Sequence, residues 1–572
     1  MSKFIFLIIC LVFLSFLTKD VFAIVDPLAH PNNQYGIHVI DENDLASAAS
    51  LVNSTGGDWG YVTIVIRDDD FKLSKWKEIF TRFRKLHLIP LVRLATHVED
   101  GAWTIPKSGD AFRWAEFLSQ MPWPVMNRYV ILFNEPNHAA EWGNTIDPEG
   151  YSEIVQKFSE SLRKTSDSFF ILPAGLDMSA HSGGNTLDAA KFLQRMYVHT
   201  PSLFSSIDGW NSHSYPNPGF SASVWSRGKG TIGSFLFEDE LLKQYTQKKL
   251  PLFITETGWM HSNGKYFDRN LLSPEQVALN FQTAATTLWN RENIVAVTPF
   301  LLNYQDAPFD HFSFQKLGSS EFYPHYYAYK DLSKIAGSPA RFYRFEVSDR
   351  VFPHEIVEGS TFEREVKLKN IGDAELDPHD SFSLASSGGD NTTTLKGTLP
   401  YLDPGEQKSF PYTVHAPEKA GQYLIKSYLH HAGEEYLIDS GKVVVIPPPS
   451  VNISLSLGWR RDPSEKNATV LLYSKNHILL SKYENISIEH GTLKVASLKD
   501  IVPGDEYRVV VLVPYYLPRQ AIVKFTGDIT NISMKRHFPF DFNGDGKLSL
   551  QDIPALLQEK PHTIIGRFIG SN

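Results

Sequence analysis

The sequence predicts a multidomain protein: an α/β TIM barrel of eight βα units, then all-β sandwich modules and a short calcium-loop segment. Three observations support this fold class. Apolar strand-like runs alternate with amphipathic helical stretches from about residue 34 to 336. After about residue 340 the apolar period falls from 3.6 to 2, with Gly, Asp and Pro turns between short runs. The chain has 572 residues, too many for one ordinary hydrophobic core.

Residues 1–23 have the pattern of a secretory signal peptide. Lys3 supplies a positive charge, residues 4–17 are apolar, and Val21-Phe22-Ala23 forms a small-x-small cleavage site. An uncleaved anchor is the alternative, but the apolar run is short for a span of about 20 residues. The only cysteine, Cys10, lies in this segment. We therefore expect a mature chain without disulfides that is secreted or held at the cell surface.

Residues 24–340 contain eight apolar runs that mark the expected barrel strands. The runs are residues 35–40, 62–66, 89–94, 130–133, 169–172, 207–210, 252–255 and 295–302. Helices are expected between them, among others at residues 74–86, 111–121, 151–163 and 274–289. Eight βα units in roughly 300 residues are what a TIM barrel requires. A doubly wound open sheet is the alternative, but no glycine-rich phosphate loop follows the first strand.

The fourth and seventh strands each end in a glutamate, Glu135 and Glu256. Pro136 has no N–H and restricts the residue before it to extended geometry, so the fourth strand should stop at Glu135. The carboxyl ends of all barrel strands meet at one mouth, where the two carboxylates can act as a pair. Hydrolysis of an acetal needs such a pair, one acid to protonate the leaving oxygen and one carboxylate to attack carbon or activate water. A single glutamate at a strand end would be read as a surface residue.

With Asn134-Glu135-Pro136 on the fourth strand and Glu256-Thr-Gly-Trp on the seventh, residues 34–330 resemble the clan A glycoside hydrolases. These are retaining (β/α)8 enzymes that include cellulases, mannanases, xylosidases and β-1,3-glucanases. The resemblance implies that Glu135 is the acid/base, that Glu256 is the nucleophile, and that Asn134 binds the sugar 2-hydroxyl. It implies no cofactor for catalysis.

The resemblance extends to His213-Ser214-Tyr215 at the sixth strand, whose tyrosine would hydrogen-bond the nucleophile. Arg67, at the end of the second strand, is the candidate for the arginine beside the nucleophile. Trp142 and Trp259 are each as readily sugar platforms as packing residues. The clan usually carries a tryptophan at the end of strand eight, and residues 299–305 contain none. His97, His138 and Arg93 also fall near strand tips, where structural hydrogen bonding is the default expectation.

Residues 341–446 predict an immunoglobulin-like β-sandwich, and residues 450–537 a second β-sandwich-like module. In the first module residues 361–368 alternate, with Phe362, Val366 and Leu368 on one face. Arg364 interrupts that apolar face, which favours an edge strand. Three prolines, residues 447–449, predict a stiff linker between the modules.

Residues 538–572 contain the twelve-residue pattern of an EF-hand-type calcium loop. Its oxygen ligands would come from Asp541, Asn543, Asp545, the backbone of Lys547, and Asp552, with a glycine at position six for the turn. The segment resembles one half of a dockerin, and no second loop follows. A structural calcium clip is therefore favoured over a cell-surface or cohesin-like partner of the C-terminal modules.

These features together predict an exported glycoside hydrolase whose partner is a polysaccharide or oligosaccharide. The formal charge of −9 and the pI of about 6.1 argue against nucleic acid as a partner. Two alternatives remain open: a non-catalytic surface protein that binds glycans with its barrel, and a transglycosylase that uses the same site.

Overall fold

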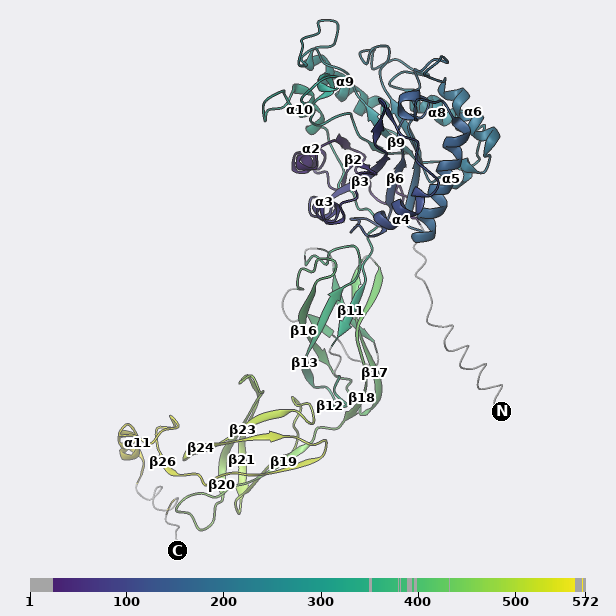
Figure 1. The fold of residues 1–572 in the computed structure, drawn as a ribbon. Helices are drawn as coiled ribbons and strands as arrows, with labels where there is room; N and C mark the ends of the chain where they lie inside the picture. Colours follow the sequence, from purple (N-terminus) through teal and green to yellow (C-terminus); the bar gives the residue numbers. More distant parts are fainter. Residues whose placement is uncertain are drawn as a thin grey trace, which may run out of the picture. The chain divides into compact units, whose positions relative to one another are not determined.

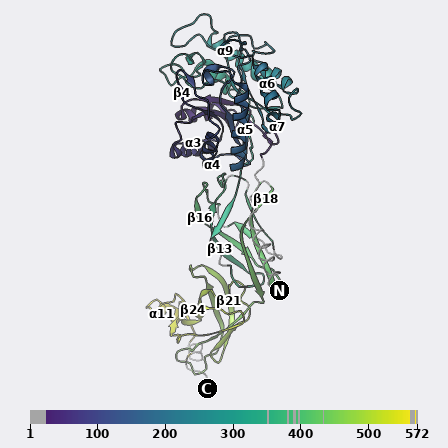
Figure 2. The ribbon, with the colours of Figure 1, turned by 45° about the vertical axis from the view of Figure 1, so that its right-hand side comes forward.

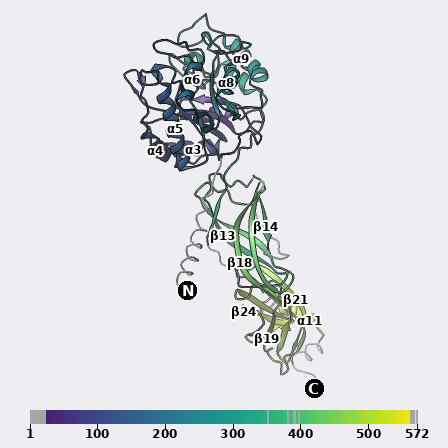
Figure 3. The same cartoon turned by 90° about the vertical axis from the view of Figure 1, so that its right-hand side faces the viewer.

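The computed structural model describes residues 24–348, 352–378, 380, 382–387, 393–395, 399–431, 433–560 and 568. The predicted signal peptide, with Cys10, lies outside the described residues. The chain divides into two compact units, Met1–Phe342 and Tyr343–Asn572, which are described separately. Within the described ranges no helix is both long enough and apolar enough to cross a membrane. In the first unit helices surround the strands in every view (Figures 1, 2 and 3).

The first unit is a closed parallel barrel, so the predicted fold class is confirmed there. One sheet has the strand order β1 (Gly36–Val39), β2 (Gly60–Arg67), β3 (Leu88–Ala95), β6 (Arg128–Leu132) and β7 (Phe169–Pro173). The other has the order β10 (Ile294–Val297), β9 (Leu252–Thr257) and β8 (Trp210–Ser214). Parallel bridges from Tyr35 to Val297 and from Asp177 to His213 join the sheets at both edges.

The barrel strands are apolar along their whole length because both of their faces are buried. In β6, Val130 and Leu132 belong to the core between strands and helices, whereas Tyr129 and Ile131 belong to the cluster inside the barrel. The strand therefore packs on both sides and carries the chain rigidly to the barrel mouth, where Glu135 follows.

The helices that cover the barrel follow the predicted pattern. They are α2 (Leu45–Val52), α3 (Leu73–Lys85), α4 (Asp110–Ser119), α5 (Pro148–Thr165), α6 (Ala189–His199), α7 (Leu203–Ser206), α8 (Ser234–Leu242), α9 (Pro274–Thr283) and α10 (Pro324–Lys330). Ser273 caps α9 by accepting a hydrogen bond from the Gln276 N–H, at 3.2 Å. The helix predicted to residue 289 continues beyond α9 as a π-helical turn, Ala284–Leu288.

The sixth barrel strand lies further along the chain than predicted. Residues 207–210 were expected, but β8 spans Trp210–Ser214 and is buried throughout. Its polar side chains have buried partners: Ser212 Oγ donates to Glu238 Oε1 at 2.7 Å, and Trp210 Nε1 donates to Glu238 Oε2 at 2.6 Å. The buried side chains of this strand are largely polar and are satisfied by hydrogen bonds, so the strand does not form an apolar run. A prediction based on apolar runs therefore ends at its first residue.

The second unit begins with two four-stranded sheets around one core. One has the order β11 (Phe345–Ser348), β13 (Thr361–Asn370), β16 (Gln407–His415), β15 (Thr393–Leu395). The other has the order β12 (Glu355–Val357), β18 (Glu434–Ile446), β17 (Gly421–His431), β14 (Ser383–Ser387). The prediction that Arg364 marks an edge strand is wrong, because β13 lies between β11 and β16. Arg364 Nη2 instead donates to the buried Asp439 Oδ2 at 2.8 Å, and this carboxylate compensates the buried charge.

An eight-stranded sheet follows in the second unit. Its order is β25 (Ile529–Ser533), β19 (Ser450–Ser454), β22 (Thr492–Val495), β21 (Leu479–Glu489), β20 (Glu465–Tyr473), β23 (Glu506–Val513), β24 (Tyr515–Lys524), β26 (Pro539–Asp541). The expected calcium loop leads from β26 to a short helix, α11 (Asp552–Gln558).

Candidate active site

A cavity of about 660 Å³ opens at the carboxyl ends of the barrel strands. Both predicted carboxylates line it, together with residues that follow most of the eight strands. The lining residues used below are Ile40, Arg67, Arg93, Asn134, Glu135, His138, Glu141, Trp142, Asp177, Ser179, Tyr215, Asn217, Phe220, Glu256, Phe300, Tyr304, Phe309 and Phe312.

Glu135 stands where the chain leaves β6, and its backbone is strained. Its φ of 28° and the φ of 73° at Phe133 lie in the left-handed region, which non-glycine residues rarely adopt. The extended geometry predicted from Pro136 is therefore wrong. The Glu135 N–H donates to the Gly175 carbonyl at 3.2 Å, and its side chain is 20% exposed toward the cavity. Such strain is typical of residues whose position serves a function.

Glu256 lies near the end of β9 and is surrounded by hydrogen-bond donors. Arg93 Nη1 donates to its Oε1 at 2.5 Å, and the Tyr215 hydroxyl donates to its Oε2 at 3.0 Å. Burial raises the pKa of Glu256, but His213, Arg93, His38 and the Tyr215 hydrogen bond together lower it to about 2. Burial also lowers the pKa of His38 to about 3, so His38 is neutral near pH 7 and Arg93 is the permanent positive charge.

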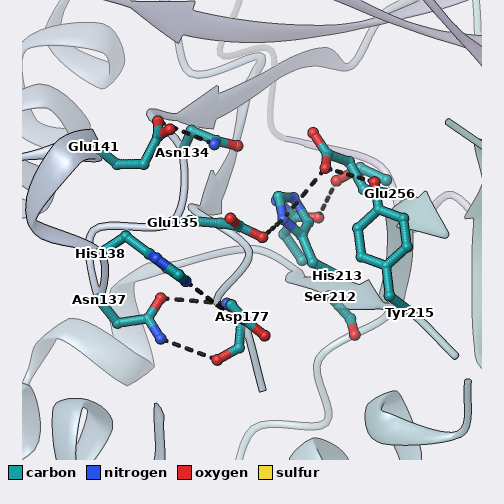
Figure 4. A network of polar contacts seen from close by, with 12 residues as sticks. Asn134, Glu135, Asn137, His138, Glu141, Asp177, Ser212, His213, Tyr215 and Glu256 are labelled. Carbon is teal, nitrogen blue, oxygen red and sulfur yellow. Dashed lines mark hydrogen bonds and ion pairs between the residues drawn. The ribbon is translucent and has the colours of Figure 1, made fainter. Parts of the chain in front are cut away.

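His213 lies between the two carboxylates (Figure 4). Its Nδ1 is hydrogen-bonded to Glu135 Oε1 at 2.7 Å and lies 3.7 Å from Glu256 Oε2. Burial lowers the pKa of His213, but the charges of Glu256 and Glu135 outweigh burial and raise it. Gly175 makes room for the ring, since a Cβ there would lie 2.2 Å from His213 Cδ2.

The three groups are also compact enough to be considered as metal ligands. One oxygen of Glu135, one of Glu256 and one ring nitrogen of His213 all lie within 4.8 Å of one another, and they form the only such group of three among the described residues. The Arg93 guanidinium already donates to Glu256, so a second cation would meet a positive charge there. The donor set around Glu256 suits an ionised carboxylate better than a metal ligand.

Asn134 is fixed by two side chains. Its Oδ1 accepts from Arg93 Nη1 at 2.6 Å, and its Nδ2 donates to Glu141 Oε2 at 3.1 Å. Burial raises the pKa of Glu141, a third carboxyl group in the cavity that sequence reasoning missed. Glu141 ends a short 3-10 helix, Ala139–Glu141, beyond the strand tips, so no strand pattern marked it.

His138 and Asp177 form a second polar pair in the cavity. His138 Nε2 lies 2.9 Å from Asp177 Oδ2, and this hydrogen bond raises the pKa of His138. Asn137 orients Asp177 from behind by donating to its carbonyl at 3.0 Å and accepting from its N–H at 3.2 Å. Ser179 Oγ donates to Asp177 Oδ1 at 2.6 Å. These contacts leave a polar surface on the Glu135 side of the cavity.

The arginine predicted beside Glu256 is the wrong one. Arg67 lies at the cavity rim, where its side chain is 46% exposed and forms an ion pair with Asp69 at 2.5 Å. Arg93 holds Glu256 instead. The signal was present in the sequence, because a charged residue inside the buried run 89–94 requires a buried partner.

The two tryptophans considered as sugar platforms are packing residues. Trp259 is 1% exposed and lies outside the cavity lining; its Nε1 donates to the Ala222 carbonyl at 2.9 Å. Trp142 borders the cavity but is also 1% exposed, with its ring packed edge-on against Phe133 and Tyr151. Neither presents an open ring face.

No protein-family model and no curated protein matches the chain. Similar solved structures include a family 39 glycoside hydrolase from Bacteroides cellulosilyticus WH2, at 14% identity and a TM-score of 0.38, covering 68% of this chain and 82% of that one. They also include endo-glycoceramidase II from Rhodococcus sp., at 11% identity and a TM-score of 0.33, covering 69% and 99%. A family 44 xyloglucanase from Paenibacillus polymyxa matches at 11% identity and a TM-score of 0.32, covering 68% and 97%.

The contacts of Glu256 predict that its carboxyl stays ionised until the pH approaches 2, far below the ordinary glutamate pKa of about 4.3. Because the pKa is lowered in the folded state, these contacts stabilise the fold above about pH 4.3 and lose that effect as the pH falls through about 2. Arg93→Met should raise the pKa of Glu256 toward its ordinary value. A ¹³C NMR titration of the Glu256 carboxyl measures its pKa in the unaltered protein and in the Arg93→Met variant. Glu256→Gln assigns the signal. Titration at the ordinary pKa in the unaltered protein would contradict this description of the site.

Proposed function

We propose that the protein is an exported retaining β-glycosidase in which Glu135 is the acid/base and Glu256 the nucleophile. The spacing of the two carboxylates is the observation that carries the proposal: one oxygen of each lies within 4.8 Å of the other. Retaining enzymes hold their carboxyl groups about 5–5.5 Å apart, whereas inverting enzymes leave about 6.5–9.5 Å for a water molecule. The spacing supports direct attack by a carboxylate on the sugar.

The unequal surroundings of the two glutamates support the division of roles. Glu256 is the more buried of the two and receives donors from Arg93 and Tyr215, which keep it ionised as a nucleophile must be. Glu135 is more exposed to the cavity and bonded to His213, so it can exchange a proton with a leaving group and then with water.

The reaction then takes two steps. Glu135 protonates the glycosidic oxygen while Glu256 attacks the anomeric carbon, which releases the alcohol and leaves the sugar bonded to Glu256. Glu135 next removes a proton from water, and the water oxygen replaces Glu256 at the same carbon, restoring the original configuration. Asn134, held between Arg93 and Glu141, is placed to contact the sugar 2-hydroxyl in both steps.

The proposed export rests on the signal-peptide pattern of residues 1–23.

For the C-terminal loop we propose a structural calcium ion rather than a partner-binding role. Asp541 is 3% exposed, and among the described residues its Oδ1 has no hydrogen-bond partner. An unpaired buried carboxylate oxygen is costly unless a cation neutralises it. Asp541, Asn543, Asp545, the Lys547 carbonyl and Asp552 would supply the oxygens, and Gly546 has the φ of 77° that the turn requires.

Two variants separate the roles of the glutamates. Glu256→Gly should abolish hydrolysis and leave room for azide, which should convert an activated β-glycoside to the α-glycosyl azide. Glu135→Ala should lose about 10²–10⁴-fold in rate on substrates with poor leaving groups, keep the first step for activated ones, and give the β-glycosyl azide. The anomers are read by ¹H NMR.

Glu160→Ala, which removes an exposed glutamate of α5, is the control and should retain full activity. The role assignment fails if both catalytic variants give the same anomer. Hydrolysis of a substrate with a poor leaving group at the unaltered rate after loss of either glutamate would remove the glycosidase proposal.

Calcium should stabilise the second unit. At a hundredfold excess over its Kd, an ion that binds the folded state alone raises the free energy of unfolding by about 2.7 kcal/mol. Asp541→Ala should remove this gain, whereas Asp528→Ala, which changes an exposed loop aspartate, should keep it. Thermal unfolding with calcium and with EDTA provides the measurement. Identical melts of the unaltered protein would show that the loop binds no calcium.

A further inference from the structure

The cavity has two unlike walls. The wall that carries Glu135 is polar, and Figure 4 shows Asn134, His138, Glu141 and Asp177 gathered on that side. Asn217 joins this wall by donating to Ser179 Oγ at 3.2 Å. These groups offer many donors and acceptors, which is what the hydroxyls of a sugar require.

The opposite wall is aromatic and apolar. Its residues come from the loops after β1, β8 and β10: Ile40, Phe220, Phe300, Tyr304, Phe309 and Phe312. The rings pack edge to face on one another, with centroids 5.3 Å apart for Phe300 and Phe309 and 5.6 Å apart for Phe300 and Phe312. Of the six side chains only that of Tyr304 can form a hydrogen bond. A sugar ring on this wall would find few partners for its hydroxyls, whereas an apolar group needs none.

The apolar character continues outward from the cavity. Ile40 is 44% and Phe309 is 41% exposed. The loop after β9 carries two further exposed rings outside the cavity lining, Tyr266 and Phe267, which are 74% and 73% exposed. That loop is tied to the aromatic wall, because the Lys265 N–H donates to Asp310 next to Phe309. Exposed apolar side chains gathered at the edge of a cavity mark a binding surface for an apolar group.

We propose that the substrate is a β-glycoside of an apolar alcohol, with the sugar on the polar wall and the alkyl or aryl group on the aromatic wall. This inference rests on the proposed glycosidase function. The catalytic pair lies at the boundary: Glu135 belongs to the polar wall, while Glu256 is held by Tyr215, whose ring packs against Phe220 at 5.1 Å and Phe312 at 5.7 Å.

A bond held between the two carboxylates therefore joins a polar part of the substrate to an apolar one. Hydrolysis breaks the bond between the anomeric carbon and the glycosidic oxygen. The released alcohol takes the proton of Glu135, and water supplies the new hydroxyl of the sugar. A polysaccharide would instead place a second sugar against the apolar wall.

The test uses the full-length protein and the sugar whose 4-nitrophenyl β-glycoside it hydrolyses fastest. The methyl, hexyl and dodecyl β-glycosides of this sugar, below their micelle concentrations, are compared with its β-linked disaccharide. A fully buried methylene contributes about fourfold in binding. We expect kcat/KM to rise at least about 100-fold from methyl to dodecyl and to exceed that of the disaccharide.

Two variants assign the effect to the aromatic wall. Phe309→Ser and Ile40→Ser should each cut the dodecyl-to-methyl ratio of kcat/KM at least about tenfold; the ratio is insensitive to the fraction of folded enzyme. Phe112→Ser, which removes a more exposed ring from α4, should leave the ratio unchanged.

A dodecyl-to-methyl ratio of kcat/KM near one in the unaltered protein overturns the inference, as does a disaccharide hydrolysed faster than the dodecyl glycoside. Neither result contradicts the proposed glycosidase function. If every aryl glycoside is inert, the proposed function fails and the inference with it.

Discussion

The arrangement of the mouth depends on one partly buried cation, the guanidinium of Arg93, whose side chain is 14% exposed. The same nitrogen donates to Glu256 on β9 and to Asn134 beyond β6, so it joins two strands that are not neighbours in the barrel. A carboxylate as buried as Glu256 would otherwise be strongly disfavoured in its ionised form. Because Arg93 compensates it, the carboxylate stays ionised and fixed, and Asn134 is set beside it. Loss of Arg93 should therefore disturb both the charge and the geometry of the site.

The rest of the mouth is built on the rigidity of the barrel. Glu135 keeps a strained φ because β6 is packed on both faces and its N–H is bonded to Gly175. Gly175 serves twice, since its missing side chain also admits the His213 ring. His213 then reaches both carboxylates, and β8 beneath it is held by Glu238 from α8. A site whose side chains are fixed by such supporting contacts needs little rearrangement during reaction.

Much of this could be predicted from the sequence, and the misses have physical reasons. The strand ends at Glu135 and Glu256 followed from apolar runs, which report burial directly. The position of Arg93 inside a buried run indicated that it has a buried partner, but the identity of that partner depends on strand register, which local sequence does not encode. Val65 pairs with Arg93 and Arg67 with Ala95, so Arg67 lies two residues further toward the rim. The polar strand β8 was misplaced because its side chains are satisfied by the distant Glu238.

In the C-terminal unit too, the sequence does not show which distant residue is the partner of a buried charge. The prediction of an edge strand at Arg364 is wrong because the buried partner of Arg364, Asp439, lies 75 residues away in the chain. Alternation identified the strands, but only the folded arrangement shows which buried charge meets which. The sequence did not predict the aromatic wall either, because its residues come from loops after three different strands and have no common spacing.

The most direct test of the account is to trap the sugar on the nucleophile. A 2-deoxy-2-fluoro β-glycoside with a good leaving group lets the first step proceed and slows the second, because fluorine destabilises the positively charged transition state of both. The account predicts that the protein gains the mass of one fluorosugar and that peptide mapping by mass spectrometry places it on Glu256. A label on Glu135, or turnover without any covalent label and with inverted product, would contradict it.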